Sequence, residues 1–238
     1  MKILALESSA VAASVCVCED EELIAQSFQH TGLTHSRTLM PMCRDLLENC
    51  GLGLEEMELI AVAAGPGSFT GLRIGVAAAK GLAWPGDKPC AGVSTLEAMS
   101  WPLAHLDGDI CAVMDARRSQ VYNALFTAGG GTLTRRCGDR AVSIEALAEE
   151  LKIRGKAQIL VGDGAKLCYN ELIGSGLDVR LAPPHLLYQS AWGVARGALE
   201  LARRGGLVSA AALTPTYHRL SQAERERLSK SKGEESNG

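Results

Sequence analysis

The segment Gly65 to Gly75, with the sequence GPGSFTGLRIG, combines a glycine turn with a serine and an arginine. The glycines accept backbone dihedral angles that other residues avoid, and Pro66 restricts one φ angle. Free backbone amides at the start of the following helix attract anions, and Arg73 adds a positive charge nearby. The segment is therefore a candidate anion site, and the alternative is a turn shaped only for packing.

The same segment lacks the two common phosphate-binding motifs. A P-loop needs Gly-Lys-Ser/Thr after its spacer, but Leu72 follows Gly71 here. Thr70 occupies the place of the third glycine in the dinucleotide motif GxGxxG. Ser68 superficially suggests a nucleophile, but GPGSFTG is not the GxSxG motif, so we expect Ser68 to cap the helix.

Histidine and cysteine residues show no spacing typical of a metal site. Among the five histidines, His30 and His35 lie five apart in a loop and the others are isolated. The eight cysteines include no CxxC pair, and Cys16 and Cys18 should share one face of a strand, which is poor spacing for zinc. We expect no metal, and we expect the cysteines to be small core residues in a reducing compartment.

Composition excludes several classes of protein. With 238 residues, 47% of them apolar, the chain is long enough for one large domain or two lobes. A net charge of −3 and only 4% aromatic residues argue against direct, strong binding to nucleic acid. The start MKILALESSA does not resemble a signal peptide, and no apolar run is long enough to span a membrane. We expect a soluble cytoplasmic protein without a membrane partner.

Apolar periodicity predicts an order of elements that occurs twice: three strands, a helix, a strand, a glycine turn and a helix. The first half has predicted strands at 2–6, 12–18, 23–28, 59–64 and 91–93, with helices at 37–49, 70–83 and 94–105. The second has strands at 110–114, 121–127, 133–137, 158–161 and 178–181, with helices at 143–153, 165–172 and 189–204. Serines 94 and 143 are expected helix caps. Each half should form a mixed sheet, because a meander of three strands is followed by strand–helix units that add parallel strands.

Two such α/β lobes side by side resemble the actin-like ATPase superfamily. The resemblance implies an α/β, two-lobed actin-like (ASKHA, ribonuclease H-like) fold, each lobe a mixed sheet with helices. We expect residues 1–106 and 188–220 to form the first lobe with partner-docking helices, and residues 107–187 the smaller second lobe. Residues 221–238 are polar without an apolar period, so we expect a disordered or loosely docked tail.

Five segments together resemble the TsaB (YeaZ) family. They are GPGSFTGLRIG at 65–75, LMPM at 39–42, GVSTL at 92–96, DARR at 115–118 followed by Val121 and Tyr122, and PTYHR at 215–219. The last resembles the closing PxYLR segment of the family, with His218 where leucine is usual. The matches follow the expected order, and the central motif is long and specific.

The resemblance implies a role in modifying tRNA. Family members act as the non-catalytic subunit of the complex that installs threonylcarbamoyl on the adenosine beside the anticodon. They support the catalytic paralog TsaD, and the small ATPase TsaE joins them. We therefore expect no enzyme activity, no cofactor bound by this chain alone, ATP as a candidate at the complex interface, contact with tRNA only through the complex, and a homodimer when the chain is alone. The alternative is a stand-alone actin-fold ATPase or a metallopeptidase-like enzyme.

The residues that replace the metal ligands of the paralog fit this implied division of labour. TsaD-type proteins carry two metal-binding histidines in an HxxxH pattern. Alignment on Gly92 and Val93 puts Thr95 and Met99 at those two positions, with Glu97 between them. Threonine is a weak ligand, and methionine does not suit a hard or borderline metal that binds oxygen substrates.

Candidate nucleotide contacts follow from the fold-level resemblance. In actin-like folds the first strands of the two lobes end opposite each other, with acidic residues that help to hold a metal-bound phosphate. Glu7 and Asp115 stand at those positions, and Ser8 and Ser9 follow Glu7. Arg117 also offers a charge to an anion, but no glycine follows Asp115 to let a phosphate approach. The alternative, an exposed hairpin turn, is favoured.

The docking surface is predicted on the helices at 37–49 and 70–83. Gly71, Gly75 and Ala79 recur four apart, so they share one helical face that another backbone can approach closely. The predicted interface residues are Leu39, Met42, Cys43, Leu46, Gly71, Arg73, Gly75 and Ala79. The alternative is that the small-residue stripe packs only against the sheet of this chain.

Overall fold

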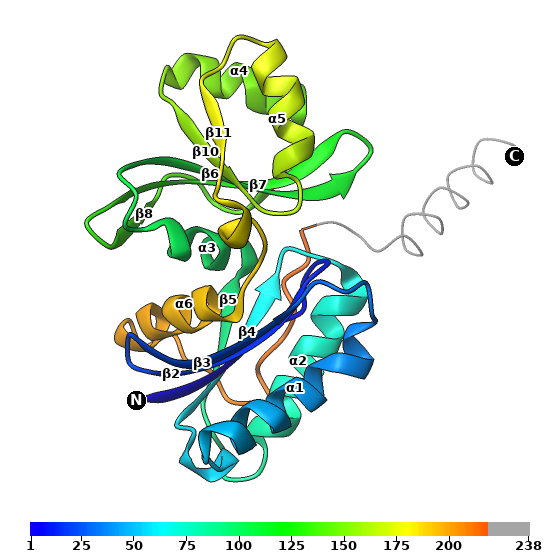
Figure 1. The fold of residues 1–238 in the computed structure, drawn as a ribbon, viewed down its shortest axis with the longest axis vertical. Coiled ribbons are helices and arrows are strands. Elements are labelled where there is room, and N and C mark those ends of the chain that lie inside the picture. Colours follow the sequence, from blue (N-terminus) through cyan, green and yellow to red (C-terminus); the bar gives the residue numbers. More distant parts are fainter. Residues whose placement is uncertain (219–238) are drawn as a thin grey trace, which may run out of the picture.

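The first lobe is built on a five-stranded mixed sheet (Figure 1). The computed structural model describes residues 1–218. The strands are β1 (Lys2–Glu7), β2 (Ala13–Glu19), β3 (Glu22–Gln29), β4 (Leu59–Gly65) and β5 (Cys90–Ser94), in the order β3-β2-β1-β4-β5. β1, β2 and β3 pair antiparallel, whereas β4 pairs parallel with both β1 and β5.

Three helices cover this sheet. Helices α1 (His35–Cys50) and α2 (Phe69–Ala83) pack on one face, and α6 (Ala191–Arg203) packs on the other (Figure 1). Successive side chains of a strand point to opposite faces. Leu4 and Leu6 of β1 therefore enter the core under α1 and α2, while Ile3 and Ala5 enter the core under α6.

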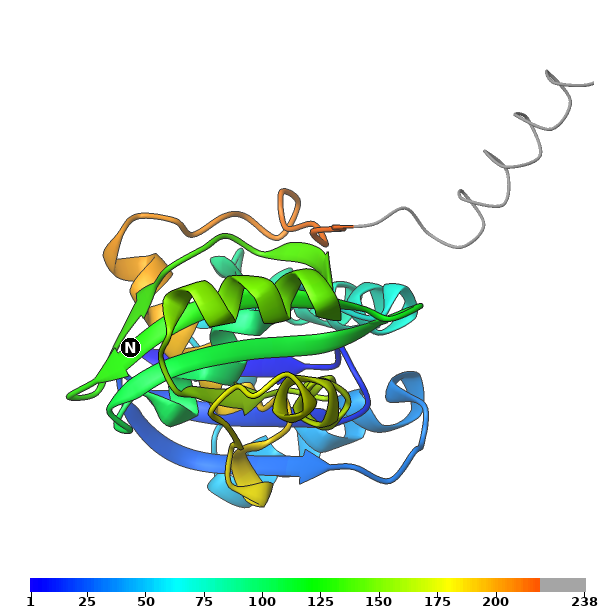
Figure 2. The same cartoon turned by 90° about the horizontal axis from the view of Figure 1, so that it is seen from above.

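The second lobe repeats the same sheet order. Its strands are β6 (Gly108–Arg117), β7 (Gln120–Gly129), β8 (Thr132–Arg135), β9 (Arg140–Ser143), β10 (Gln158–Val161) and β11 (Val179–Leu181). They run β11-β10-β6-β7-β8, and β9 pairs with β7. Helices α4 (Ile144–Arg154) and α5 (Ala165–Gly174) lie on one side of the sheet and α3 (Thr95–Ser100) lies on the other (Figures 1 and 2). The prediction of two lobes, each a mixed sheet with helices, is confirmed.

Most elements lie where the periodicity predicts them, and two of the three local differences below have a physical reason. The helix predicted at 94–105 is α3 followed by a 3-10 turn, Trp101–Leu103, because Pro102 has no amide hydrogen to continue the helix. β9 was not predicted from the sequence, because it is four residues long and too short to show an alternating pattern. The helix predicted from residue 189 begins at Ala191.

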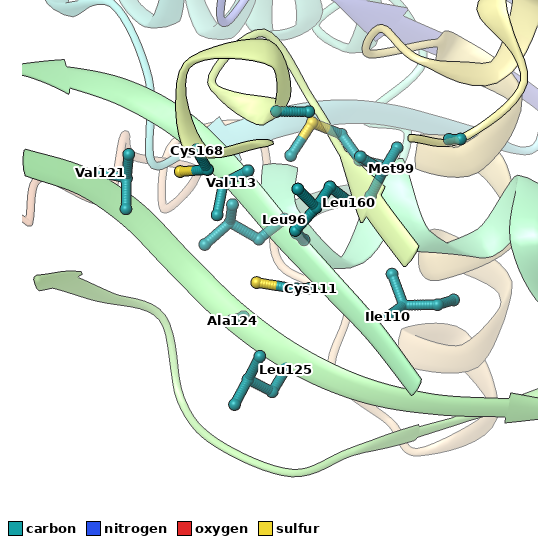
Figure 3. Close-up of a cluster of buried hydrophobic side chains, with 14 of the residues drawn as sticks. Leu96, Met99, Ile110, Cys111, Val113, Val121, Ala124, Leu125, Leu160 and Cys168 are labelled. Atoms are coloured by element: carbon teal, nitrogen blue, oxygen red, sulfur yellow. The ribbon is translucent and has the colours of Figure 1, made fainter. Parts of the chain in front are cut away.

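α3 lies between the lobes although the sequence assigned it to the first. Its Leu96 and Met99 side chains enter the core of the second lobe, beside Ile110, Val113 and other residues of β6 and β7 (Figure 3). Short 3-10 turns also occur at Leu54–Glu56 and Pro184–Leu186. The predicted tail, 221–238, lies outside the described residues.

Candidate functional site

Glu7, the last residue of β1, is buried where the two lobes meet. The Ser9 amide donates a 2.6 Å hydrogen bond to Oε1, whereas Oε2 has no partner among the described residues. Burial raises the pKa of Glu7 to about 7, hydrogen bonds from Ser9 lower it, and the negative charge of Asp163 in the second lobe raises it. A substantial fraction of Glu7 is therefore protonated at neutral pH.

Asp163 lies between β10 and α5, in a glycine turn whose role the sequence did not indicate. Burial raises the pKa of Asp163, the hydrogen bond from Gln189 lowers it, and the charge of Asp115 raises it. Gln189 Nε2 donates to Asp163 Oδ1 over 2.8 Å. Because β6 and β10 are parallel, their carboxyl ends bring Asp115 and Asp163 to one edge of the sheet. The position of Asp163 after a predicted strand was the available signal.

The surroundings of Glu7 oppose direct phosphate binding. Glu7 is itself fully buried, and its Oε1 already accepts the Ser9 amide. The Ser8 hydroxyl is buried and donates to the Gly71 carbonyl oxygen over 3.0 Å, so the structure contradicts its prediction as a phosphate contact. Ser9 is also fully buried. The fold brings Glu7, Ser8 and Ser9 together, but as part of the packing between β1 and α2.

Asp115 and Arg117 are exposed at the end of β6, beside the turn to β7, and this position of Arg117 agrees with the favoured alternative. The Arg117 backbone amide donates a 2.6 Å hydrogen bond to Asp115 Oδ1. Arg117, Arg118 and Ser119 all have positive φ angles, a conformation that tight hairpin turns require. The Asp115 carboxylate therefore stabilises the turn.

Close backbone contacts explain the glycine turn. A Cβ atom on Gly65 would lie 2.2 Å from the Thr216 carbonyl oxygen, and one on Gly67 would lie 2.5 Å from that of Ser9. The Ser68 amide donates to Ser9 over 2.6 Å, and the Ser68 hydroxyl accepts from the Gly71 amide. Ser68 thus caps the helix as predicted. The amides of Ser68 and Gly71 both donate to groups of this chain and are not free to bind an anion. The geometry favours the packing interpretation over the anion site.

The small-residue stripe of α2 faces the interior of its own lobe. The prediction that a partner protein packs against this stripe is therefore wrong. A Cβ atom on Gly71 would lie 2.1 Å from the Ser8 carbonyl oxygen, and one on Gly75 would lie 2.5 Å from Ser8 Oγ. Ala79 is fully buried. These residues let α2 approach the sheet of its own chain, so they cannot meet a partner in this conformation.

Most of the predicted interface residues on α1 are also buried. Leu39, Met42 and Cys43 pack in the same core as α2, and Leu46 is half-buried beside them. Burial raises the pKa of the Cys43 thiol to about 12. Of the predicted set only Arg73 is exposed. Any docking surface on these helices must therefore use their outer residues.

Packing residues fill the two positions that the motif alignment matches to an HxxxH pattern. Thr95 is fully buried, and Met99 is 1% exposed and lies in the core of the second lobe (Figure 3). Glu97 accepts a 2.9 Å hydrogen bond from Arg135. Within residues 1–218, no three or more histidine, cysteine, aspartate or glutamate side chains are grouped so as to hold a metal ion.

Comparisons with known proteins agree with these motifs. A model of the TsaD family, tRNA N6-adenosine threonylcarbamoyltransferase, matches residues 25–183. The tRNA threonylcarbamoyladenosine biosynthesis protein TsaB of Bacillus subtilis is 33% identical over 227 residues, which cover 94% of this chain and 96% of that protein. The chain belongs to the TsaB family.

Solved structures of the family share the fold of this chain. A Pseudomonas aeruginosa protein described as similar to peptidase YeaZ superimposes with a TM-score of 0.79 at 26% identity, covering 92% of this chain and 99% of that one. A second structure, YeaZ from the same organism, gives 0.74 at 25% identity and covers 91% and 99%. In the described part of the chain, no helix is both long and apolar enough to cross a bilayer.

Proposed function

We propose that this chain is a non-catalytic subunit in the biosynthesis of threonylcarbamoyladenosine on tRNA. Its TsaB relatives are named for that pathway, and the matching family model is that of the transferase TsaD. The observation that carries the proposal is the burial of Thr95 and Met99 in packing positions, where the paralog has its metal-binding histidines. A chain that lacks those ligands contributes to the reaction by contact.

The partners in this proposal are a TsaD-like catalytic paralog and a TsaE-like ATPase, with tRNA bound only through the complex. The chain forms a homodimer when alone and works in the cytoplasm. ATP is held at the complex interface and not by this chain alone. The burial of Glu7 and Ser9 and the hydrogen bond of the Ser8 hydroxyl to the Gly71 carbonyl oxygen support the last point, because these groups do not face an open phosphate site.

The outer face of α1 and α2 is the proposed docking surface for the paralog. Met40 is 44% exposed on α1, and Arg73 is exposed on α2. Methionine adapts its shape to different partners, and arginine is enriched at the centres of interfaces. The buried glycine stripe supports this surface from beneath by holding α2 close to the sheet.

Reconstitution tests the proposal. The purified chain, a TsaD-type paralog and a TsaE-type ATPase are mixed with threonylcarbamoyl adenylate, ATP and unmodified tRNA, and modified adenosine is quantified by mass spectrometry. We expect product only when this chain and the paralog are both present. Modified tRNA formed by this chain alone would contradict the proposal. Metal-dependent peptidase or ATPase turnover by the isolated chain would favour the stand-alone enzyme instead.

A further inference from the structure

Phe69, Arg73 and Tyr217 form a side-chain cluster at the start of α2. Phe69 and Tyr217 are stacked, with ring centroids 4.7 Å apart and planes inclined by 29°. The Arg73 guanidinium carbon lies 3.9 Å from the centroid of Phe69. Arg73 Nε also donates a 3.1 Å hydrogen bond to the Tyr217 hydroxyl. Two aromatic rings therefore fix the direction of one arginine.

The segment that brings Tyr217 to this cluster is anchored by main-chain contacts. Residues 208–217, which we call the strap, cross the first lobe to the glycine turn (orange in Figure 1). Val208 exchanges two backbone hydrogen bonds with Cys90, at 2.8 and 2.9 Å. The Thr216 amide donates to the Ala64 carbonyl oxygen over 2.7 Å. Because the residue before it is held in this way, the Tyr217 ring has little freedom to leave Arg73.

The charge of Arg73 has no acidic partner within residues 1–218, although the side chain is exposed. Two other exposed arginines of the same lobe are paired, Arg44 with Asp45 at 2.9 Å and Arg203 with Glu200, whereas Arg37 on α1 resembles Arg73 in having no ion pair within residues 1–218. Within residues 1–218, the contacts of Arg73 occupy Nε and one face of the guanidinium. Its two Nη groups have no hydrogen-bond partner in this described range.

We propose that Arg73, held by Phe69 and Tyr217, binds a carboxylate side chain of the protein that docks on α1 and α2. This inference rests on the proposed function. An arginine fork matches a carboxylate with two parallel hydrogen bonds, and arginine and tyrosine are enriched among the residues that dominate binding energy. A side chain that is already ordered loses little entropy on binding.

A protein carboxylate is favoured over an RNA phosphate for two reasons. The chain has a net charge of −3, whereas RNA binding relies on many phosphate contacts from clustered cations. The nearest basic residue on the same helix, Lys80, donates to the Ala211 carbonyl oxygen of the strap. A single oriented guanidinium suits one carboxylate.

The test measures the affinity of the full-length chain for the TsaD-type paralog by calorimetry at low and high salt. Four variants are compared with the wild type, namely R73A, R73K, Y217F and R180A, and a fifth, R73E, serves for a charge swap with the paralog. Arg180 is an exposed arginine on β11 of the other lobe and serves as the matched control. Circular dichroism confirms that each variant is folded.

We expect R73A to bind at least about 30-fold more weakly and to lose most of the salt dependence. R73K should recover only part of that loss, because an ammonium group cannot form the paired hydrogen bonds. Y217F keeps the stacked ring but lacks the hydroxyl, so a loss of about threefold is expected. R180A should match the wild type. Restoration of binding to R73E by an acidic-to-arginine change on the paralog would identify the carboxylate.

If the wild type binds the paralog and R73A binds it with the same affinity, this inference is wrong and the proposed function still stands. Failure of the wild type to bind the paralog would overturn the proposed function, and the inference with it. If R73A leaves protein affinity unchanged but lowers retention of tRNA by the assembled complex, the ligand is a phosphate and the carboxylate assignment is wrong.

Discussion

At the scale of single residues, the unusual feature is a buried carboxylic acid between the lobes that has no basic partner in the part of the chain that the structure describes. Glu7 is fully buried, and its pKa is raised to about 7 by that burial. The neighbouring Asp163 also has a raised pKa because of burial. Removing a carboxylate from water disfavours its charged form, so the folded chain binds protons here that the unfolded chain releases.

The pH dependence of stability should reveal this group. An acid with a raised pKa binds more protons in the folded state, so stability falls as pH rises from about 4.5 to about 7 and then levels off for this group. The loss is on the order of 3 kcal/mol. Glu7→Gln stays neutral and should remove that part of the slope. Urea denaturation at several pH values between 4.5 and 8 measures it, and parallel curves for the two proteins would contradict the assignment.

At the scale of elements, the close packing of α2 on the sheet depends on glycine residues that leave one face of the helix without side chains. A Cβ atom at Gly71 has no room beside the Ser8 carbonyl oxygen, at 2.1 Å. Gly81 lies on the same helix, and a Cβ atom there would meet nothing within 4 Å. The two glycines thus have opposite roles, since one permits close packing and the other only lowers helix propensity.

The two alanine substitutions should therefore change stability in opposite directions. Gly81→Ala is expected to stabilise the chain by about 0.5–1 kcal/mol, because alanine is the better helix former. Gly71→Ala gains the same propensity but forces α2 away from β1, so a net loss of about 2–3 kcal/mol is expected. Chemical denaturation measures both. Equal effects of the two changes would show that α2 does not pack as described.

At the scale of the whole molecule, two helices join the lobes. α6 packs on the first sheet, and α3 places Leu96 and Met99 in the second core. The helices meet closely, because a Cβ atom on Gly193 of α6 would lie 1.9 Å from the Ala98 carbonyl oxygen of α3. The lobes are therefore coupled by packing at this crossing.

This coupling predicts one cooperative unfolding transition for the wild type. Gly193→Ala should separate α3 from α6, lower the melting temperature by several degrees and broaden or split the transition. Gly174→Ala on α5, where a Cβ atom meets nothing within 4 Å, is the matched control. Differential scanning calorimetry compares the calorimetric and van't Hoff enthalpies. A single sharp transition in G193A at the wild-type temperature would show that the crossing does not couple the lobes.

The sequence by itself determined the elements, the repeated lobe and the family. Ser68, Ser94 and Ser143 cap their helices as predicted, because a cap depends on backbone amides only three residues away. Strand and helix periods are equally local, and the motif at 65–75 is long enough to mark the family without coordinates.

Only the tertiary structure decided which side of α2 is buried and which residue faces the surface. The glycine stripe is compatible with an internal or an external partner until Ser8 is seen against it. The contact of Arg73 with Tyr217 joins residues 144 positions apart, and the pKa of Glu7 depends on burial and on Asp163 in the other lobe. Packing and desolvation act between groups that the fold brings together, so a local pattern in the sequence does not record them.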